Sequence, residues 1–456
     1  MTAKRRRLQL LAIMLPAAAL LATACAPAHQ ARDTASTTAP SSSASPPPAT
    51  TGACGPGTTC YTPQQLQAAY GVTPLLDRGF DGKGQTIVLP ELAETHLSPP
   101  VVTDMRQDMT AYDHQFHLPA AQMKVVTTLA GASSPWLAFA EEVLDVEVVH
   151  ALAPDARLVI LLLPNTSMDN TRNEVAATTA ALRLGPALGG VMSISAAGQV
   201  AGQHCVSRAQ ASHLNTDLHT AVNHGMTVVA SSGDIGAAAY QCDLYAALTG
   251  TPPATPAKGI LMLASNPYVL SAGGTALSAS STGTWTSETA WDLASGNSGN
   301  AGGSFQASGG GFSDLFARPS YQVGVPGTRA AERGAPDVSA DASDRPGIAV
   351  VFRNGSQVTV ESHGGTSAAA PIWAALIALA DQYAGHHLGF VNPAIYQIAR
   401  SRNYHQAFHD VTTGNNTAQF ARTTITGYQA APGWDPVTGW GSPNAQVLIP
   451  LLARTR

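Results

Sequence analysis

The sequence has few charged residues and no dense run of one charge within its body. Only 12% of the 456 residues are charged, and the formal net charge is −5. The one basic run, Lys4-Arg5-Arg6-Arg7, lies at the extreme N-terminus, so no folded face is expected to bind nucleic acid. Apolar residues make up 45% of the chain, which is enough to bury a large core and excludes the disordered and fibrous classes.

Long apolar runs are also scarce. The segment from Leu8 to Ala24 is shorter than the ~20 apolar residues of a membrane span, it contains Pro16, and it follows the basic run. Residues 1–25 are therefore interpreted as a secretory signal, which predicts a secreted, extracellular protein. Ala22-Thr23-Ala24-Cys25 resembles a bacterial lipobox, although a larger aliphatic residue usually stands at Ala22. Lipidation of Cys25, which would anchor the protein at the cell surface, is left open.

The residues that follow cannot bury a core. Residues 26–60 are rich in Ala, Ser, Thr and Pro and are interpreted as a flexible linker before a folded body at 61–456. Four cysteines remain when Cys25 is set aside, and an even number in an exported protein favours two disulfides. Three pairings exist, and proximity along the chain alone favours Cys54–Cys60 and Cys205–Cys242.

Apolar runs alternate with helical segments throughout the first half of the body. Strands are expected at 87–89, 158–163, 191–194, 227–230 and 260–263, and helices at 135–152, 170–184 and 207–225. Unbroken apolar runs are typical of strands that are covered on both faces. The alternation predicts an α/β fold in one domain, with a mainly parallel central sheet flanked by helices. No coiled-coil signal appears, so a monomer is expected.

Two common hydrolase signatures are missing. The sequence has no His-Gly-Thr-His motif and no Gly-x-Ser-x-Gly around Ser367, which argues against a histidine-based triad and against an esterase or lipase. Gly364-Gly365-Thr366-Ser367 instead runs into the apolar segment 372–380, which places Ser367 in the first turn of a buried helix. Free N–H groups and the helix dipole there favour an oxyanion, so Ser367 is the candidate nucleophile. The alternative is that Thr366 or Ser367 only caps the helix.

Carboxyl groups are the candidates for the base that Ser367 needs. Glu141 and Asp145 lie four residues apart on one face of an apolar helix, where two neighbouring carboxyls tend to share a proton. The alternative is an exposed acidic face that also includes Glu142 and Glu147. Asp234 follows an apolar strand, and in its protonated form it could donate to an oxyanion. Its alternative is a plain turn residue.

Together these features resemble the sedolisin family of serine-carboxyl peptidases. The matching motifs are Tyr61-Thr62-Pro63-Gln64-Gln65-Leu66, Glu141-x-x-x-Asp145, Ser232-Gly233-Asp234, residues 308–313, residues 336–341, Gly364-Gly365-Thr366-Ser367, Asn392-Pro393 and residues 433–436. The resemblance covers nearly all of residues 61–456 and implies a subtilisin-like fold. It also implies Ser367 as nucleophile, Glu141 as general acid and base, Asp145 as the residue that orients Glu141, and Asp234 as oxyanion donor. Protein or peptide substrates and an acidic pH optimum follow from these roles.

The resemblance also implies one structural Ca²⁺. The matching ligands are the carboxylates of Asp410 and Asp435 and the main-chain oxygens of Val411, Ala431 and Gly433. Hard oxygen donors in this mixture suit calcium. The alternative is that the two aspartates are ordinary turn residues.

Two departures from the family limit what can be carried over. Family enzymes usually carry a folded prodomain, whereas only the linker precedes Tyr61 here, and Ala196 stands where an aromatic residue commonly shapes the cleft. Endopeptidase action is the default expectation, with release of tripeptides as a variant. The competing hypothesis is an inactive peptidase fold that serves as a surface binding protein.

Overall fold

The computed structural model describes residue 54 and residues 59–93, 103–127, 136–138, 140–164, 171–195, 205–239, 257–293, 306–420 and 423–455. The signal segment, Cys25 and most of the linker lie outside the described residues. Within the described part, no helix is long and apolar enough to cross a membrane.

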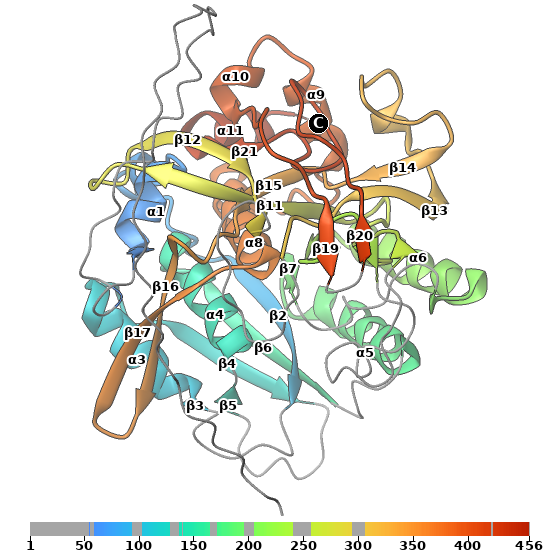
Figure 1. Ribbon diagram of the computed structural model, residues 1–456. Coiled ribbons are helices and arrows are strands. Elements are labelled where there is room, and N and C mark those ends of the chain that lie inside the picture. The colour runs from blue at the N-terminus through green and yellow to red at the C-terminus, as the bar shows by residue number, and fades with distance from the viewer. Residues whose placement is uncertain are drawn as a thin grey trace, which may run out of the picture. The chain divides into compact units, whose positions relative to one another are not determined.

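An eight-stranded, mainly parallel sheet forms the centre of the described structure (Figure 1). Seven of its strands run in the order β12-β11-β8-β7-β2-β6-β4, and β15 also pairs with β11. All described pairings in this sheet are parallel except that of β11 with β12. The strands are β2 (Thr86–Ala93), β4 (Gln122–Thr127), β6 (Arg157–Pro164), β7 (Val191–Ile194), β8 (Thr227–Ser231), β11 (Leu270–Ala279), β12 (Trp285–Ala290) and β15 (Val338–Asp341).

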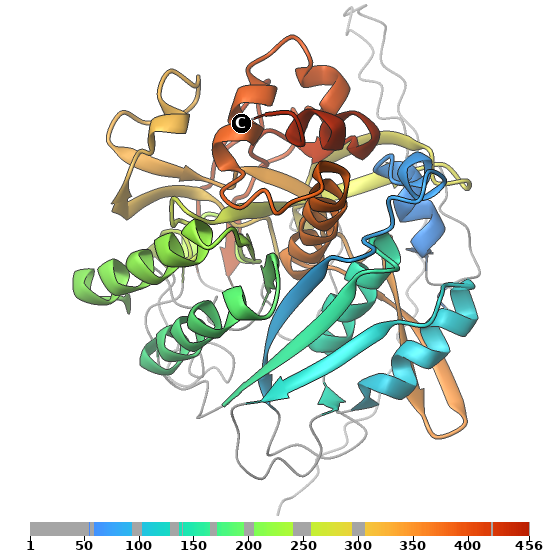
Figure 2. The same ribbon diagram turned by 180° about the vertical axis from the view of Figure 1, so that it is seen from behind.

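Helices cover both faces of this sheet (Figures 1 and 2). Along β2, Ile87 and Leu89 point into the core on the side of α4 and α8, whereas Val88 points into the core on the side of α5 and α6. The helices are α1 (Pro63–Ala69), α2 (Thr73–Leu76), α3 (Met105–Phe116), α4 (Ala140–Leu152), α5 (Thr171–Leu184), α6 (Arg208–Asn223), α8 (Thr366–Ala384), α9 (Asn392–Ala399), α10 (Tyr404–Ala407) and α11 (Ala445–Leu452). Burial on both faces explains the unbroken apolar runs of these strands.

Smaller sheets of two or three strands surround the central sheet in the described structure. A hairpin of β16 and β17 leads into α8, and β1 pairs with β16. These strands are β1 (Cys60–Tyr61), β3 (Thr103–Asp104), β5 (Leu137–Ala138), β9 (Ala238–Ala239), β10 (Ala257–Lys258), β13 (Gly311–Ala317), β14 (Glu332–Ala335), β16 (Gly347–Asn354), β17 (Gln357–His363), β18 (Phe408–His409), β19 (Ala418–Phe420), β20 (Thr423–Ile425) and β21 (Ser442–Pro443).

The sequence located most of the central elements. Four of the five expected strands fall within β2, β6, β7 and β8, and the helices expected at 170–184 and 207–225 correspond to α5 and α6. Helix α6 starts after Ser207, whose hydroxyl accepts from the Gln210 amide at 3.2 Å while the Gln210 side chain accepts from the Ser207 amide at 3.0 Å. Such a capping box defines a helix start.

Two boundaries were wrong. Residues 260–263 form no strand, although Ile260 and Leu263 are buried: Leu261 is an isolated bridge residue, and a turn follows it. A short apolar run does not reveal its secondary structure, and the next strand of the central sheet is β11. Helix α4 starts at Ala140 rather than at 135, because Leu137–Ala138 pairs with β3 as a short antiparallel strand. Both Glu141 and Asp145 remain on the helix.

The disulfide expected between Cys54 and Cys60 is present. Cys205 is also disulfide-bonded, and its predicted partner Cys242 lies outside the described residues.

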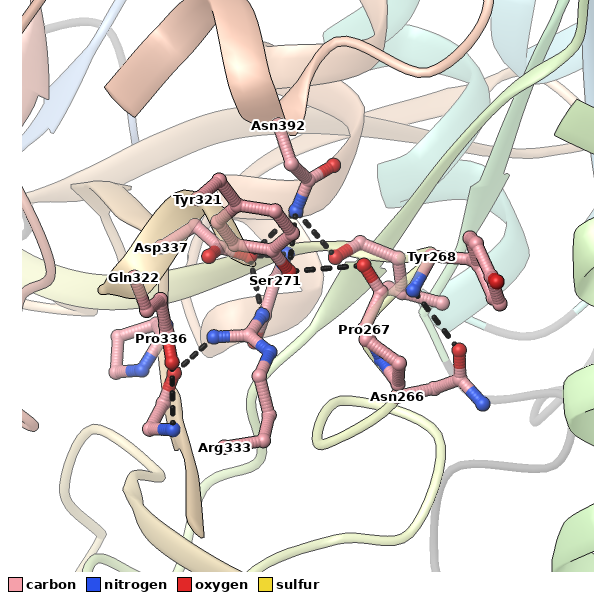
Figure 3. Close-up of polar contacts among 12 residues, drawn as sticks. Asn266, Pro267, Tyr268, Ser271, Tyr321, Gln322, Arg333, Pro336, Asp337 and Asn392 are labelled. Atoms are coloured by element: carbon pink, nitrogen blue, oxygen red, sulfur yellow. Dashed lines mark hydrogen bonds and ion pairs between the residues drawn. The ribbon is translucent and has the colours of Figure 1, made fainter. Parts of the chain in front are cut away.

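A buried ion pair links segments around the start of β15 (Figure 3). Arg333 and Asp337 are fully buried, and Nη2 of Arg333 lies 2.6 Å from Oδ2 of Asp337. The Ser271 amide and the Asn392 side chain donate to the same oxygen at 2.9 and 3.1 Å, and the Tyr396 hydroxyl donates to Oδ1 at 2.8 Å. Asp337 therefore connects β11, β14 and α9, which gives the matching motifs at 336–341 and 392–393 a structural role.

Candidate active site

The carboxyl ends of three neighbouring parallel strands converge on one edge of the sheet. Glu91 lies near the end of β2, Ser195 directly follows β7, and Asp234 lies three residues after β8. Loops at this edge of α/β sheets commonly form ligand sites. The N-terminal part of α8 and helix α4 contribute the remaining groups.

Ser367 is the second residue of α8. The N-cap position belongs to Gly365, which has a φ of 93° and makes no side-chain cap, so neither Thr366 nor Ser367 serves as the N-cap. The Ser367 side chain is hydrogen-bonded to the carboxyl group of Glu141 and is partly exposed. A hydroxyl at a helix start, in contact with a carboxyl group, is the arrangement expected of an activated nucleophile.

Helix α4 packs directly against α8 and supplies Glu141 in its first turn and Asp145 one turn later. Asp145 is completely buried. Glu142 and Glu147 are also buried, and Oε2 of Glu147 accepts from the Val351 amide of β16 at 2.9 Å. The alternative of an exposed acidic face is therefore wrong.

Burial raises the pKa of both Glu141 and Asp145. The pKa of Glu141 is raised to about 7 by burial, against the hydrogen bond from Ser367, and the charge of Asp234 raises it further. Burial raises the pKa of Asp145 well above its usual range, and the Glu141 charge adds to this. Carboxyls that share a desolvated site resist ionising together, so the group is expected to hold protons well above pH 4.

Glu91 is a further acid of this site that the sequence analysis missed. It is 1% exposed, and its carboxyl group is hydrogen-bonded to that of Asp145. Oε1 of Glu91 and Oδ2 of Asp145 are buried without an amide or hydroxyl donor, as expected of two carboxyl groups that share a proton. Burial raises the pKa of Glu91 well above its usual range, and the charge of Asp145 raises it further. In the sequence, the feature that could have indicated Glu91 is an acidic residue two positions after the apolar run 87–89.

Ser195 joins Asp145 to the backbone of the nucleophile. Its Oγ lies 2.8 Å from Oδ1 of Asp145 and 3.1 Å from the carbonyl oxygen of Ser367. Pro371 lies four residues after Ser367 and has no N–H, so this carbonyl lacks its usual helical donor. The Ser195 hydroxyl lies within reach to replace that donor, and its single hydrogen serves either this carbonyl or Asp145 at one time. Ala196, the residue that departs from the family pattern, lies outside the described residues.

Asp234 approaches the same helix start from β8. Its Oδ1 accepts from the Thr366 amide at 2.8 Å and from the Thr366 hydroxyl at 2.6 Å. Burial raises the pKa of Asp234, while the two hydrogen bonds from Thr366 oppose the shift. The structure thus brings together Ser367, Glu141, Asp145 and Asp234, the four side chains singled out in the sequence.

The expected calcium ligands come from two adjacent loops. The Gly433 amide lies 3.2 and 3.1 Å from the two carboxylate oxygens of Asp410, and the Ala431 amide donates to Asp435 at 3.0 Å. The Thr438 hydroxyl lies 3.1 Å from Asp435 Oδ2 and 3.4 Å from the Val411 carbonyl. Two carboxylates and nearby carbonyls fit Ca²⁺ in donor type. Among the described residues no cluster of three or more His, Cys, Asp or Glu could hold a metal, in keeping with a set that has two acidic side chains.

Comparisons with known proteins point to one family. The chain is 34% identical over 398 residues to kumamolisin from Bacillus sp. (strain MN-32), a match that covers 84% of this chain and 62% of kumamolisin. It is 36% identical over 224 residues to sedolisin from Pseudomonas sp. (strain 101), covering 49% of this chain and 34% of that protein. Human tripeptidyl-peptidase 1 is 31% identical over 266 residues, covering 54% and 41% respectively. The chain thus spans less than two thirds of the length of each of these relatives.

The fold agrees with these matches. The structure of Pseudomonas sedolisin, a serine-carboxyl proteinase complexed with two molecules of pseudo-iodotyrostatin, superposes with a TM-score of 0.66 at 24% identity, covering 86% of this chain and 98% of that one. This confirms the α/β, subtilisin-like fold with a mainly parallel central sheet. No family model matches the sequence. On the similarity to kumamolisin and sedolisin together with this fold, the chain belongs to the sedolisin family.

Proposed function

We propose that this protein is a serine-carboxyl peptidase that hydrolyses peptide bonds at acidic pH. The observation that carries the proposal is the hydrogen bond between the Ser367 side chain and the Glu141 carboxyl group at the start of α8. The protonated carboxyl expected of Asp234, held beside Ser367 by Thr366, supports it from the other side.

Acylation begins with Ser367 Oγ. The oxygen attacks the carbonyl carbon of the scissile peptide bond while its proton passes to the ionised Glu141 carboxylate. The charge that develops on the substrate oxygen accepts a hydrogen bond from protonated Asp234 and lies near the positive end of α8. Glu141 then returns the proton to the leaving amine, which leaves an acyl group on Ser367.

Deacylation uses the same groups. Glu141 takes a proton from a water molecule, which attacks the acyl carbonyl, and the proton then returns to Ser367 as the carboxylic product leaves. Asp145 orients Glu141. A proton shared among Glu141, Asp145 and Glu91 keeps the net charge of this buried group low throughout.

These roles require acidic conditions. Asp234 must keep its proton to donate to the oxyanion, and the Glu141 and Asp145 pair must retain one proton between them. Cleavage is therefore expected to fall as the pH rises and Asp234 and Asp145, whose pKa values are raised by burial, lose their protons, whereas Glu141 must be ionised to act as the base. Undiminished cleavage at pH 8 would contradict this mechanism.

Protein or peptide chains are the proposed substrates, with internal cleavage as the main mode. A cavity of about 290 Å³ lies beside Ala140, the residue before Glu141, and is also lined by Phe352 and Glu361 of the hairpin that leads to Ser367. None of the four candidate catalytic side chains lines this cavity, so internal cleavage is proposed from the family resemblance, with release of tripeptides as the variant. The signal segment supports export, and a monomer is the proposed state.

One Ca²⁺ is proposed at the loops of Asp410 and Asp435, with the carbonyls of Val411, Ala431 and Gly433 as further ligands. When bound, the ion would crosslink the segments that precede and follow β19 and β20. Its contribution is to stability, since none of these residues contacts Ser367 or Glu141 through a described hydrogen bond.

The test is cleavage of an unstructured protein by the purified chain from pH 3 to 8, with the products identified by mass spectrometry. Ser367→Ala and Glu141→Ala are compared with Glu332→Gln, which changes an exposed glutamate that pairs with Arg329. Thermal melts verify that each variant is folded. Cleavage confined to acidic pH, lost in the first two variants and kept in the third, is the expected result.

The products separate the remaining possibilities. Internal fragments support an endopeptidase, whereas serial release of tripeptides supports the exopeptidase variant. Folded, calcium-supplied protein that cleaves nothing at any pH, and whose Ser367 is not acylated by an active-site reagent, would favour the inactive binding protein.

A further inference from the structure

Thr366 contacts Asp234 through both of its polar groups. The Thr366 amide and hydroxyl lie 2.8 and 2.6 Å from the same oxygen, Oδ1 of Asp234. The Thr366 hydroxyl oxygen in turn accepts from the Gly233 amide at 3.0 Å. Thr366 is fully buried, so no solvent competes for these bonds.

The direction of each hydrogen follows from this arrangement. Because the Gly233 N–H points at the Thr366 oxygen, the single hydroxyl hydrogen of Thr366 is free to point at Asp234. Oδ1 of Asp234 then accepts two hydrogen bonds, and a proton bound to this oxygen would collide with the two hydrogens that already point at it. If Asp234 is protonated, its proton lies on Oδ2.

The backbone leaves room for that second oxygen. A Cβ atom placed on Gly365 would lie 2.8 Å from Oδ2, closer than real Cβ atoms approach, and the φ of 93° at Gly365 is itself unfavourable for other residues. Oδ2 of Asp234 therefore lies beside Gly365, the N-cap residue of α8.

We propose that Thr366 is a positioning residue that directs the proton of Asp234 onto Oδ2, toward the oxyanion that forms on attack by Ser367. This inference deepens the proposed peptidase function and rests on it for the catalytic consequence. The Thr366 hydroxyl does not touch the substrate; it acts by occupying Oδ1 and fixing the rotation of the carboxyl group.

The hydroxyl also affects the titration of Asp234. A hydrogen bond donated to the carboxylate favours its ionised form, so the Thr366 hydroxyl lowers the pKa of Asp234 against the effect of burial. Among the described residues, the titratable group that interacts with Asp234 is Glu141 of α4. Loss of the hydroxyl is therefore expected to raise the pKa of Asp234.

The experiment compares Thr366→Val, Thr366→Ala and Thr366→Ser with the wild type. Valine keeps the shape and removes the hydroxyl, alanine is the smaller second choice if valine prevents folding, and serine restores the hydroxyl. The matched control is Thr275→Val, since Thr275 donates to the buried carboxyl group of Glu288 at 2.9 Å, outside the candidate site.

Two quantities are measured on the full chain. Carbon NMR of protein labelled at aspartate carboxyls gives the pKa of Asp234, whose signal is identified by its loss in Asp234→Asn. Peptide cleavage gives kcat and KM separately. Without the hydroxyl, we expect a higher pKa for Asp234 and a kcat at least about tenfold lower with little change in KM, short of the ~10²–10³ loss for a deleted oxyanion donor. Serine should restore both values, and Thr275→Val should change neither.

Either an unchanged Asp234 titration or a kcat within twofold of the wild type, in a folded variant without the hydroxyl, would overturn the proposal. Failure of serine to restore the wild-type values would do the same. If the wild type cleaves no peptide at any pH, the proposed function fails, and the titration alone still decides whether the Thr366 hydroxyl controls the Asp234 proton.

Discussion

Replacement of Asp337 by asparagine keeps the size of the side chain. It is nevertheless expected to destabilise this protein strongly, because the side chain is fully buried and carries a charge. Three donors point at Oδ2, namely Arg333 Nη2 at 2.6 Å, the Ser271 amide at 2.9 Å and the Asn392 side chain at 3.1 Å (Figure 3). An asparagine can keep its oxygen there only by turning its NH₂ group toward the Tyr396 hydroxyl, which now donates at 2.8 Å.

The main loss is electrostatic. Arg333 and Asp337 are both 0% exposed, so the substitution leaves a buried guanidinium without its counter-charge. Removal of one partner of a buried ion pair costs about 3–5 kcal/mol in the free energy of unfolding. The exposed pair of Arg329 and Glu332, 2.8 Å apart, provides the control, because Glu332→Gln should cost no more than about 1 kcal/mol.

The assay is urea unfolding followed by tryptophan fluorescence at one fixed pH, with the midpoint and slope compared between variants. A double variant, Arg333→Met with Asp337→Asn, removes the uncompensated charge and should recover part of the lost stability. If Asp337→Asn unfolds within about 1 kcal/mol of the wild type, as the surface control does, the assignment of Asp337 as the centre of a buried charged network is refuted.

Four further predictions concern the acids and the loops around them. Glu91→Leu should move the alkaline limit of cleavage to higher pH, because the hydrogen bond from Glu91 lowers the pKa of Asp145 and its loss lets Asp145 keep its proton to higher pH; an unchanged pH profile of kcat/KM would contradict this. The raised pKa values mean that the folded state holds more protons than the unfolded state, so the free energy of unfolding should fall by about 1.4 kcal/mol per pH unit for each such proton as the pH rises from about 4.5 toward 7. Urea midpoints that rise over this range would show the opposite sign. Gly365→Ala should abolish cleavage and lower the melting temperature, since its Cβ would lie 2.8 Å from Asp234 Oδ2, and wild-type kcat in this variant would count against the geometry. Calcium should raise the melting temperature of the wild type but not of Asp435→Asn, as measured by thermal melts with added Ca²⁺ or chelator.

The sequence was sufficient to predict the general class of fold, because a strand that is buried on both faces needs apolar residues at consecutive positions. The apolar runs at 87–89 and 158–163 have no polar residue, which is the pattern that strands covered on both sides require. The same reasoning was wrong at 260–263, where the residues are buried but form no strand, because burial and strand pairing are separate properties. It also extended α4 too far, since the pairing of Leu137–Ala138 with β3 is a contact between distant segments.

The residues of the candidate site also divide into those that local sequence spacing could indicate and those that only long-range packing brings to the site. Spacing alone placed Glu141 and Asp145 on one helix face and Ser367 at a helix start, because these relations depend only on helical geometry. Glu91 and Ser195 were not assigned to the site, since their roles depend on β2 and β7 ending beside Asp145, which is a long-range result of the sheet order. Whether Glu142 and Glu147 face solvent was likewise decided by what packs against α4.

The sequence by itself determined which residues could supply chemistry and which elements would carry them, since capping, periodicity and residue type act over a few positions. Only the tertiary structure decided which oxygen of Asp234 accepts from Thr366, and that the Ser195 hydroxyl lies between Asp145 and the Ser367 carbonyl. Hydrogen bonds are directional over about 3 Å, so they are set by the packing of distant elements against one another, and no local pattern records that packing.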